Sequence, residues 1–296
     1  PISRLLENLK PVLAAEATPS EQSKTIAIIG AGAAGVEMAF SLHHRLVERE
    51  KRNLRFIVIQ RGQRIMAEFP KKAADVLMNA LKQKNISVLC GHGVEEIHRH
   101  SLRLDNGEVI EVDHTLVVTA GRPARFLTKC GLALDDHGFV AVSPSLQSTS
   151  HDDVFAAGDI ATILSSPRPK AGVFAVRAGA VLTRNLRKAL LGANLEYWQP
   201  QRHYLALVGT GDRKAMAIRG QIVLPPSRWL WHLKEWIDRR FIEKFTALPE
   251  IPQPKPSALA KQMAEEGHEG DAALAAMRCL GCGAKTGFSD LDSSIN

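Results

Sequence analysis

Hydrophobic residues in the N-terminal half of the chain follow two alternating patterns. Short, almost entirely apolar runs are typical of strands buried on both faces of a parallel sheet, and the sequence has four of them, at 25–29, 55–59, 86–89 and 115–119. Apolar residues at helical spacing predict helices at about 36–49 and 71–84, between the first three runs. Strands that alternate with helices predict an α/β fold with a mostly parallel sheet.

The pattern changes before the fourth run. From residue 94 to residue 112 apolar and polar residues alternate, and Asp105-Asn106-Gly107 supplies a turn, so the sequence predicts a small antiparallel meander there. Beyond the fourth run, an apolar stretch at 154–157 predicts another strand, and 171–190 predicts a helix.

The C-terminal part predicts smaller elements. Residues 204–224 predict a pair of β-hairpins, and 229–245 predicts an amphipathic helix. One face of this helix carries five large apolar side chains, namely Trp229, Leu233, Trp236, Ile237 and Phe241. The polar face mixes basic and acidic residues, so we expect the helix to pack against the protein body or a second copy of the chain rather than on a membrane surface. Prolines between 249 and 256 mark a linker.

Composition and charge exclude several classes of protein. The chain has 296 residues, 45% hydrophobic and 23% charged, which is typical of a globular protein and not of a fibrous or disulfide-rich one. The net charge is +7, but the basic residues are scattered, so we expect no nucleic-acid surface. Four unevenly spaced cysteines favour a cytoplasmic location, and no metal site is predicted. No apolar run approaches the ~20 residues of a membrane span.

The most informative segment follows the first apolar run. Gly30, Gly32 and Gly35 match the pattern GxGxxG between a predicted strand and a predicted helix. In this context the first glycine permits a sharp turn, the second lets the backbone approach a pyrophosphate, and the third allows close packing of helix and strand. The helix N-terminus offers N–H groups to phosphate oxygens. The segment, with Ala31 and Ala33, therefore predicts a dinucleotide site; a glycine-rich turn that serves packing alone is the alternative.

The end of the second predicted strand bears on the choice of nucleotide. Proteins that bind NAD usually have Asp or Glu there, which accepts hydrogen bonds from the adenosine ribose, but this chain has Gln60 and Arg61. A cation at this place can pair with a 2′-phosphate, so NADPH fits at least as well as NADH. The alternative is that Arg61 is only solvated.

A second motif extends the picture to a flavin. Residues 149–159, TSHDDVFAAGD, resemble the second flavin motif of the pyridine nucleotide-disulfide oxidoreductases, in which the final Asp hydrogen-bonds the ribityl chain of FAD. Together with GxGxxG, the meander and Ala120-Gly121, the order of motifs resembles the nicotinamide domain of that superfamily over about residues 24–190. The resemblance implies FAD and NAD or NADP as cofactors.

The same resemblance implies roles for individual residues. Ala120 and Gly121 would contribute to cofactor binding, and Gly158 and Asp159 would hold the flavin. A helix that begins near Ala171 would direct its positive end toward the flavin pyrimidine.

Within the superfamily, Gly35-Val36-Glu37 resembles the type II NADH dehydrogenase group, in which this Glu lies near the nicotinamide ribose. The alternative for Glu37 is an exposed first-turn acid that the helix dipole favours. Cys90 and Cys130 lie in different predicted elements, so a dithiol relay is not expected. The resemblance implies that a hydride passes from nicotinamide to flavin and then to an acceptor. Residues 169–177 lack the glutamines that this group associates with a quinone.

The C-terminal part resembles dehydrogenase-like modules fused to selenide, water dikinase. The segments that carry this resemblance are 204–212, 231–241 and, after the prolines, 278–285. The resemblance matches Cys282 to the catalytic Cys or selenocysteine of that kinase and Lys285 to a Lys that works with ATP. A selenium or sulfur acceptor would suit such a fusion. From the residues alone, Cys279 and Cys282 equally fit half of a zinc knuckle or a redox CxxC pair.

Two parts of the complete proteins are not found in the sequence. Only 11 residues follow Lys285, so the ATP-binding core of a kinase is absent, and so is an N-terminal FAD-binding half with its own glycine-rich turn. The chain also does not begin with Met. We therefore expect an internal piece of a fusion protein.

The combined prediction is an α/β fold with a Rossmann-like NAD(P)-binding domain that includes an antiparallel meander, part of an FAD-binding domain, and a C-terminal β-hairpin and helix region. The expected segments are a lead-in linker at 1–23, the NAD(P)-binding domain at 24–121, the C-terminal part of the FAD-binding domain at 122–190, the hairpin and amphipathic helix at 191–248, a linker at 249–278 and the start of the kinase-like domain at 279–296. The expected function is an FAD-dependent NAD(P)H oxidoreductase module linked to selenophosphate synthesis. The alternative is a non-catalytic nucleotide-binding module that senses redox state or acts as a scaffold.

Overall fold

The computed structural model of the chain describes residues 7, 9–13 and 23–246. The chain divides into two compact units, Pro1–Phe241 and Ile242–Asn296. The predicted linker at 249–278 and the predicted kinase-like start, with Cys279, Cys282 and Lys285, lie outside the described residues. The following description therefore concerns the first unit, together with residues 242–246, which complete helix α5 (Arg228–Thr246).

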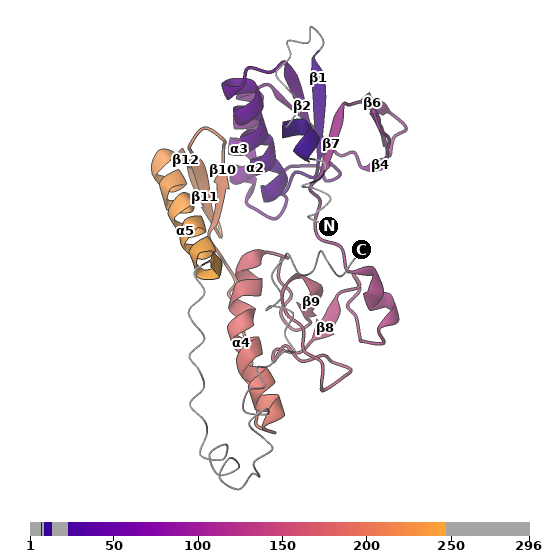
Figure 1. Cartoon of the computed structure of the whole chain (residues 1–296), viewed down its shortest axis with the longest axis vertical. Helices are drawn as coiled ribbons and strands as arrows, with labels where there is room; N and C mark the ends of the chain where they lie inside the picture. The colour runs from indigo at the N-terminus through magenta and orange to yellow at the C-terminus, as the bar shows by residue number, and fades with distance from the viewer. Residues whose placement is uncertain (1–6, 8, 14–22, 247–296) are drawn as a thin grey trace, which may run out of the picture. The chain divides into compact units, whose positions relative to one another are not determined.

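A parallel sheet forms the centre of the nucleotide-binding part. Its strands, in the spatial order β3-β2-β1-β7, are Ile86–Cys90, Leu54–Gln60, Lys24–Ile29 and His114–Val117. Helices α2 (Ala33–His43) and α3 (Lys71–Gln83) connect the first three strands in sequence, so the predicted α/β fold is confirmed. Figure 1 shows this part with α2 and α3 beside the sheet.

Both faces of strand β1 are buried, as its apolar sequence requires. Ile26 and Ile28 are fully buried against residues of α2 and α3, whereas Ala27 and Ile29 join a second cluster on the opposite face. That second cluster contains residues of the predicted meander, whose strands are β4 (Val94–Ile97), β5 (Ser101–Leu104) and β6 (Val109–Glu111). Successive side chains of a strand point to opposite faces of the sheet. The helices therefore pack on one face of β1 and the meander packs on the other.

The helix predicted to run to Arg49 has two parts. The α-helical part, α2, ends at His43, and residues His44–Arg49 form η1, a run of wider π-helical turns. Glu48 in this run accepts a hydrogen bond from Lys84 Nζ and pairs with His44 Nδ1, both at 2.6 Å. Lys84 is the residue that follows α3, so its hydrogen bond joins η1 to the end of that helix. A period-based prediction does not distinguish α-helical from π-helical turns, because the apolar stripe changes little over six residues.

The flavin-motif region is built around two short parallel strands. Strand β8 (Val140–Val142) pairs with β9 (Ala161–Ile163), and helix α4 (Gly172–Leu190) packs against them. The strand predicted at 154–157 is wrong, because only Phe155 forms a single bridge, with Gln147, before a short 3-10 helix, η3 (Gly158–Ile160). The partner is present but short: Ser148 N donates to Val154 O and Ala156 N donates to Leu146 O, and the pairing extends no further. A further 3-10 helix, η2, covers Arg125–Lys129.

The C-terminal region forms a three-stranded antiparallel sheet. Its strands are β10 (Ala206–Gly209), β11 (Ala215–Arg219) and β12 (Ile222–Ser227), in that spatial order. The predicted pair of hairpins is therefore present. Val208, Met216 and Ile218 join the same hydrophobic cluster as α2, so this sheet packs onto the nucleotide-binding part.

Helix α5 (Arg228–Thr246) packs on its sheet through only part of the predicted face. Leu230, which is outside that face, is buried with Ala215 and Ala217 of β11, and Leu233 of the predicted face is partly buried against the same cluster. Trp229 and Trp236, on the predicted face, are 59% and 57% exposed. Helical periodicity identifies an apolar stripe, but only the position of the sheet decides which side of the helix it covers.

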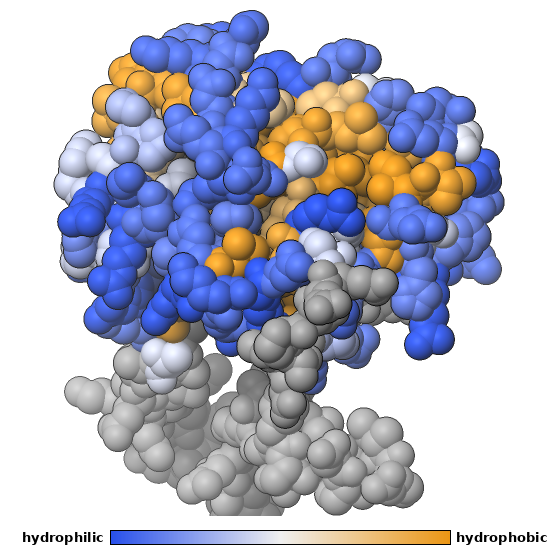
Figure 2. All heavy atoms as spheres, turned by 90° about the horizontal axis from the view of Figure 1, so that it is seen from above, coloured by the Kyte–Doolittle hydropathy of each residue, from blue (hydrophilic) through white to orange (hydrophobic). Residues whose placement is uncertain are grey.

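Large apolar side chains are also exposed outside α5, among them Ile97, Val109 and Phe126. Figure 2 shows hydrophobic patches on one face of the molecule that is otherwise mostly hydrophilic. None of the described helices is both long enough and apolar enough to cross a membrane.

Candidate functional site

The turn between β1 and α2 has the geometry that its three glycines predict. Gly30 has a φ of +107°, and a Cβ on it would lie 2.5 Å from Val118 O. A Cβ on Gly35 would overlap Gly30 O, so this position fixes the close approach of helix to strand. A Cβ on Gly32, in contrast, would meet no atom within 4 Å. The first and third glycines are therefore required by the protein itself, whereas the space above the second is open for a ligand.

The N-terminus of α2 is arranged to accept an anion. Gly32 is the N-cap and has no side chain to cap the helix, and the first turn has no acidic residue. Val36 N donates to Gly32 O, so the N–H groups of residues 33–35 precede the first helical hydrogen bond. These N–H groups and the helix dipole together favour phosphate oxygens at this point.

Gln60, at the end of β2, supports the glycine turn directly. Its Oε1 accepts a hydrogen bond from Ala31 N at 2.9 Å, and Met66 N donates to Ala31 O at 2.8 Å. Arg64 fixes the loop after β2 by donating to three carbonyl oxygens, those of Met66, Ala67 and Phe69. Sequence reasoning missed both supports. The position of Gln60 at the strand end was the available signal, whereas the bonds of Arg64 depend on the conformation of the loop.

Arg61 is exposed beside the same strand end. Arg61 and Asp105 both lie next to Gly93. A Cβ added to Gly93 would be 2.8 Å from Arg61 Nε and 2.9 Å from Asp105 Oδ2. Asp105 Oδ2 accepts a hydrogen bond from Gly93 N at 2.7 Å. Among the described residues Arg61 makes no hydrogen bond or ion pair, so its guanidinium is available to a ligand.

Ala120 and Gly121 follow the end of β7 and are exposed. Val118 N donates to Ile29 O at 2.8 Å, so the chain leaves the sheet beside the glycine turn. The structure thus brings Ala120 and Gly121 to the same edge of the sheet as Gly30, because the carboxyl ends of parallel strands share one edge.

Glu37 lies in the second turn of α2 and is half-buried. Its Oε1 accepts a hydrogen bond from Gly209 N at 3.2 Å and lies 3.3 Å from Lys234 Nζ of α5. The interpretation of Glu37 as an exposed first-turn acid is therefore wrong. Its partners come from residues far along the chain, which local sequence patterns do not indicate.

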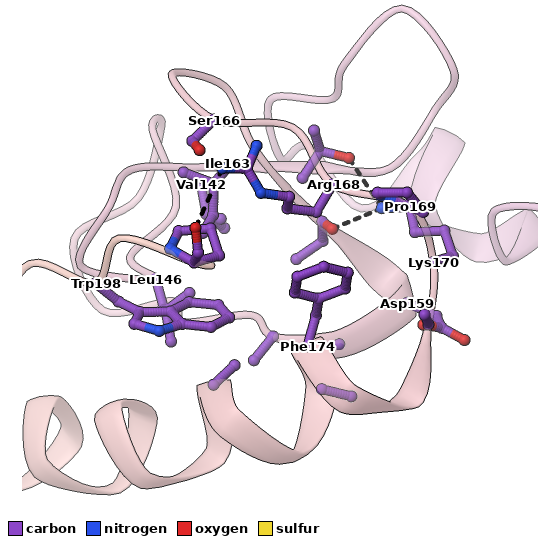
Figure 3. Close-up of a pocket in the computed structure, with 18 residues that line it drawn as sticks. Val142, Leu146, Asp159, Ile163, Ser166, Arg168, Pro169, Lys170, Phe174 and Trp198 are labelled. Atoms are coloured by element: carbon purple, nitrogen blue, oxygen red, sulfur yellow. Dashed lines mark hydrogen bonds between the residues drawn. The ribbon is translucent and has the colours of Figure 1, made fainter. Parts of the chain in front are cut away.

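The residues of the flavin motif lie at the edge of a small cavity. Gly158 and Asp159 form η3, and Asp159 is exposed. Ala171 is the N-cap of α4, which has neither a side-chain cap nor an acidic residue in its first turn. Figure 3 shows Phe174 and Trp198 at the cavity, with Asp159 toward its edge. The cavity measures about 40 Å³, which is room for only a few water molecules.

Lys170 is a further residue of this cavity that sequence reasoning missed. Its Nζ donates to Ala161 O at 2.6 Å and to Thr162 Oγ1 at 3.0 Å, and it lies 4.0 Å from the centre of the Phe139 ring. Burial lowers the pKa of Lys170, although the charges of Asp135 and Asp159 oppose this effect. A positive side chain therefore precedes the uncapped N-terminus of α4.

Comparison with known proteins identifies the arrangement. Residues 4–179 match the model of a family described as pyridine nucleotide-disulphide oxidoreductase. The chain belongs to the pyridine nucleotide-disulphide oxidoreductase family. Homologues in this family use FAD and NAD(P)H.

Two curated relatives are NADH dehydrogenases or resemble them. The type II NADH:quinone oxidoreductase of Haemophilus influenzae is 27% identical over 156 residues, 49% of this chain and 35% of that protein. The NADH dehydrogenase-like protein YutJ of Bacillus subtilis is 26% identical over 199 residues, 64% of this chain and 51% of that protein. The chain thus spans about a third to a half of the length of these relatives.

A solved structure shows the fold of the family. The sulfide:quinone oxidoreductase of Aquifex aeolicus aligns with a TM-score of 0.66 over 81% of this chain and 61% of that one, at 16% sequence identity. At this identity the likeness concerns the fold alone.

The described residues fit the family cofactors to different degrees. The open space above Gly32 and the free N–H groups of α2 fit a pyrophosphate. The exposed Asp159 and the uncapped start of α4 fit the ribityl and pyrimidine end of a flavin, but the cavity behind them is too small for a flavin ring. A flavin would therefore contact this surface from outside the cavity.

The residues that the structure describes contain neither a cysteine pair within one element nor a cluster of metal ligands. Cys90 ends β3 and is half-buried, and burial raises the pKa of its thiol. Cys130 follows η2 and is exposed. The two belong to different elements. No group of three or more His, Cys, Asp or Glu side chains in the described ranges is placed to hold a metal ion.

Proposed function

We propose that the chain is the nicotinamide-binding module of a flavoprotein oxidoreductase, which passes a hydride from NADH or NADPH to FAD and then electrons to an acceptor. The observation that carries the proposal is the glycine turn at 30–35, where a Cβ on Gly32 would meet nothing within 4 Å and Gly32 is also the N-cap of α2, which has no side-chain cap. Such a place binds the pyrophosphate of a dinucleotide.

The residues of the chain have positioning roles in this proposal. The α2 N-terminus holds the pyrophosphate, and Ala120 and Gly121 lie at the same sheet edge, where their small side chains leave room for the nicotinamide half. Asp159 accepts hydrogen bonds from the flavin ribityl chain, and the α4 N-terminus with Lys170 provides positive charge beside the pyrimidine. A bound flavin would supply the hydride-accepting and electron-transfer chemistry, which the protein orients and tunes.

Anaerobic reduction of flavin tests the proposed activity. The purified chain is mixed with FAD and then with NADH or NADPH, and the visible absorbance of the oxidised flavin is followed. We expect this absorbance to fall faster than it does with free FAD and the same nucleotide. If the chain binds both FAD and the nucleotide but flavin reduction is not faster, the proposal is contradicted and the alternative, a non-catalytic nucleotide-binding module, is favoured.

Replacement of Arg61 tests the choice of nucleotide. We expect Arg61→Gln to weaken NADPH binding about tenfold or more, because a charge-assisted hydrogen bond to the 2′-phosphate is lost, while NADH binding is nearly unchanged. Dissociation constants for both nucleotides, measured by calorimetry, give the result. Arg55→Gln is the matched control, since Arg55 is also exposed and lies at the opposite end of β2. An equal loss for both nucleotides would show that Arg61 does not read the 2′-phosphate.

The electron acceptor in our proposal is a quinone, sulfur or selenium species. The name of the Haemophilus relative, a type II NADH:quinone oxidoreductase, supports the first class. The resemblance of 204–212, 231–241 and 278–285 to modules fused to selenide, water dikinase supports selenium and a link to selenophosphate synthesis. Reoxidation rates of the reduced, flavin-loaded chain with a soluble quinone, polysulfide and colloidal selenium distinguish the three classes. A quinone that is fastest by far would contradict the link to selenium.

The cytoplasmic location remains a prediction.

A further inference from the structure

Glu37 of the nucleotide-binding part contacts both the C-terminal sheet and α5. Its carboxylate is held by Gly209 N of β10 at 3.2 Å and by Lys234 Nζ of α5 at 3.3 Å. A Cβ on Gly209 would come within 2.9 Å of Glu37 Oε1, and a Cβ on Gly211 would overlap Phe40 O. The end of β10 and the turn that follows it therefore pack tightly against α2, with no room for a side chain at Gly209 or Gly211.

Glu37 stands close to the anion site of α2. It follows Ala33 by four positions, so the two share one face of the helix and lie about 6 Å apart along its axis. A carboxylate at that distance opposes the binding of a negatively charged pyrophosphate unless a cation neutralises it.

Lys234 is placed to provide that cation. Its side chain is 23% exposed, and it pairs with Asp238 at 2.9 Å as well as with Glu37. Burial opposes the charged form, but the hydrogen bond to Asp238 and the charge of Glu37 hold the pKa of Lys234 above its usual value. The ammonium therefore stays charged wherever the nucleotide is bound near neutral pH.

We propose that Lys234 is a positioning residue of the dinucleotide site, which makes the site able to bind its anionic ligand by neutralising Glu37 from outside the nucleotide-binding fold. The inference rests on the proposed binding of NAD(P)H at the glycine turn. It gives the C-terminal helix a role in cofactor affinity that is separate from its packing on the sheet.

A double-mutant cycle tests the proposal. Lys234→Met keeps most of the side-chain length but removes the charge, and Glu37→Gln removes the charge that it neutralises. We expect Lys234→Met to raise the dissociation constant for NADH about tenfold when Glu37 is present, whereas the same replacement should have little effect in a Glu37→Gln background. The double variant should bind within about twofold of Glu37→Gln, because the carboxylate on α2 is gone, while Asp238 loses its partner in both variants that lack Lys234. The defect of Lys234→Met should also shrink as salt concentration rises.

Two further variants separate charge from structure. Lys234→Arg keeps the charge and should bind like the wild type. Lys214→Met makes the same replacement at another ion-paired lysine of the C-terminal sheet region, where Lys214 pairs with Asp212 at 3.2 Å, and should have no effect. Thermal unfolding of each variant is measured beside binding.

The outcomes are distinct. If the wild type binds NADH and Lys234→Met binds equally well, the proposed role of Lys234 is wrong. If Lys234→Met and the double variant are equally weak, Lys234 acts through structure and the proposal is wrong as well. If the folded wild type binds neither NADH nor NADPH, the proposed function of the glycine turn fails first, and the role of Lys234 fails with it.

Discussion

Gly32→Ala is expected to weaken binding of NADH and NADPH by at least tenfold, with little change in the stability of the protein. The Cβ of the alanine would meet no protein atom within 4 Å, and the backbone of Gly32, with φ of −70° and ψ of −177°, is extended and suits alanine. The added methyl group would fill the space in which the pyrophosphate approaches the backbone. It would therefore act on the ligand and not on the fold.

Calorimetric titration of the wild type and Gly32→Ala with both nucleotides measures this effect, and thermal unfolding checks the fold. We expect the free energy of unfolding to stay within ~0.5 kcal/mol of the wild type, as for a substitution that touches nothing in the protein. Unchanged affinity in a folded Gly32→Ala variant would place the ligand elsewhere.

Gly35→Ala is expected to have the opposite effect, a large loss of stability. Its Cβ would overlap Gly30 O, a backbone atom that cannot rotate away, so α2 would have to move from β1. Overpacking of this kind costs about 3 kcal/mol. For a protein of this size that corresponds to a fall of roughly 6–12 °C in the melting temperature.

The two alanine variants control each other, because they add the same methyl group three residues apart. Chemical denaturation with the helical circular dichroism signal as readout gives the free energies of unfolding for both. Equal stability of Gly35→Ala and Gly32→Ala would show that the third glycine is not needed for the contact between helix and strand. In that case the distinction between protein-required and ligand-required glycines would be wrong.

Local patterns were sufficient to predict the nucleotide-binding part. The β1 run, the three glycines and the start of α2 occupy consecutive residues, so their spacing contains the information that the turn needs. The same holds for the meander, whose alternation and Asp105-Asn106-Gly107 turn are local signals.

Features that depend on distant partners could not be predicted in this way. The apolar run at 154–157 looked like a strand, but its pairing with residues 146–148 amounts to a single bridge. Much of the α5 face predicted to pack is exposed, although Leu233 packs, since the sequence does not show where β11 lies. The partners of Glu37, Gly209 and Lys234, are more than 170 residues away along the chain.

Side-chain support of the glycine turn belongs to the same class. Gln60 lies at the position where proteins that bind NAD usually have an acid that binds the ribose. From the sequence, Gln60 was therefore considered only as a residue that lacks this acid. In the structure its carbonyl oxygen holds Ala31 N, so the residue serves the turn itself. Only the folded arrangement shows which of the two neighbours, Gln60 or Arg61, faces the loop and which is left for a ligand.

The central claim is that the space above Gly32 binds the pyrophosphate of a nicotinamide dinucleotide. Its most direct test is calorimetric titration of the intact chain with NADH and NADPH, repeated in the presence of inorganic pyrophosphate. We predict saturable binding to one site, which pyrophosphate weakens by competition. A folded chain that binds neither nucleotide, or that binds one with an affinity indifferent to pyrophosphate, would contradict the claim.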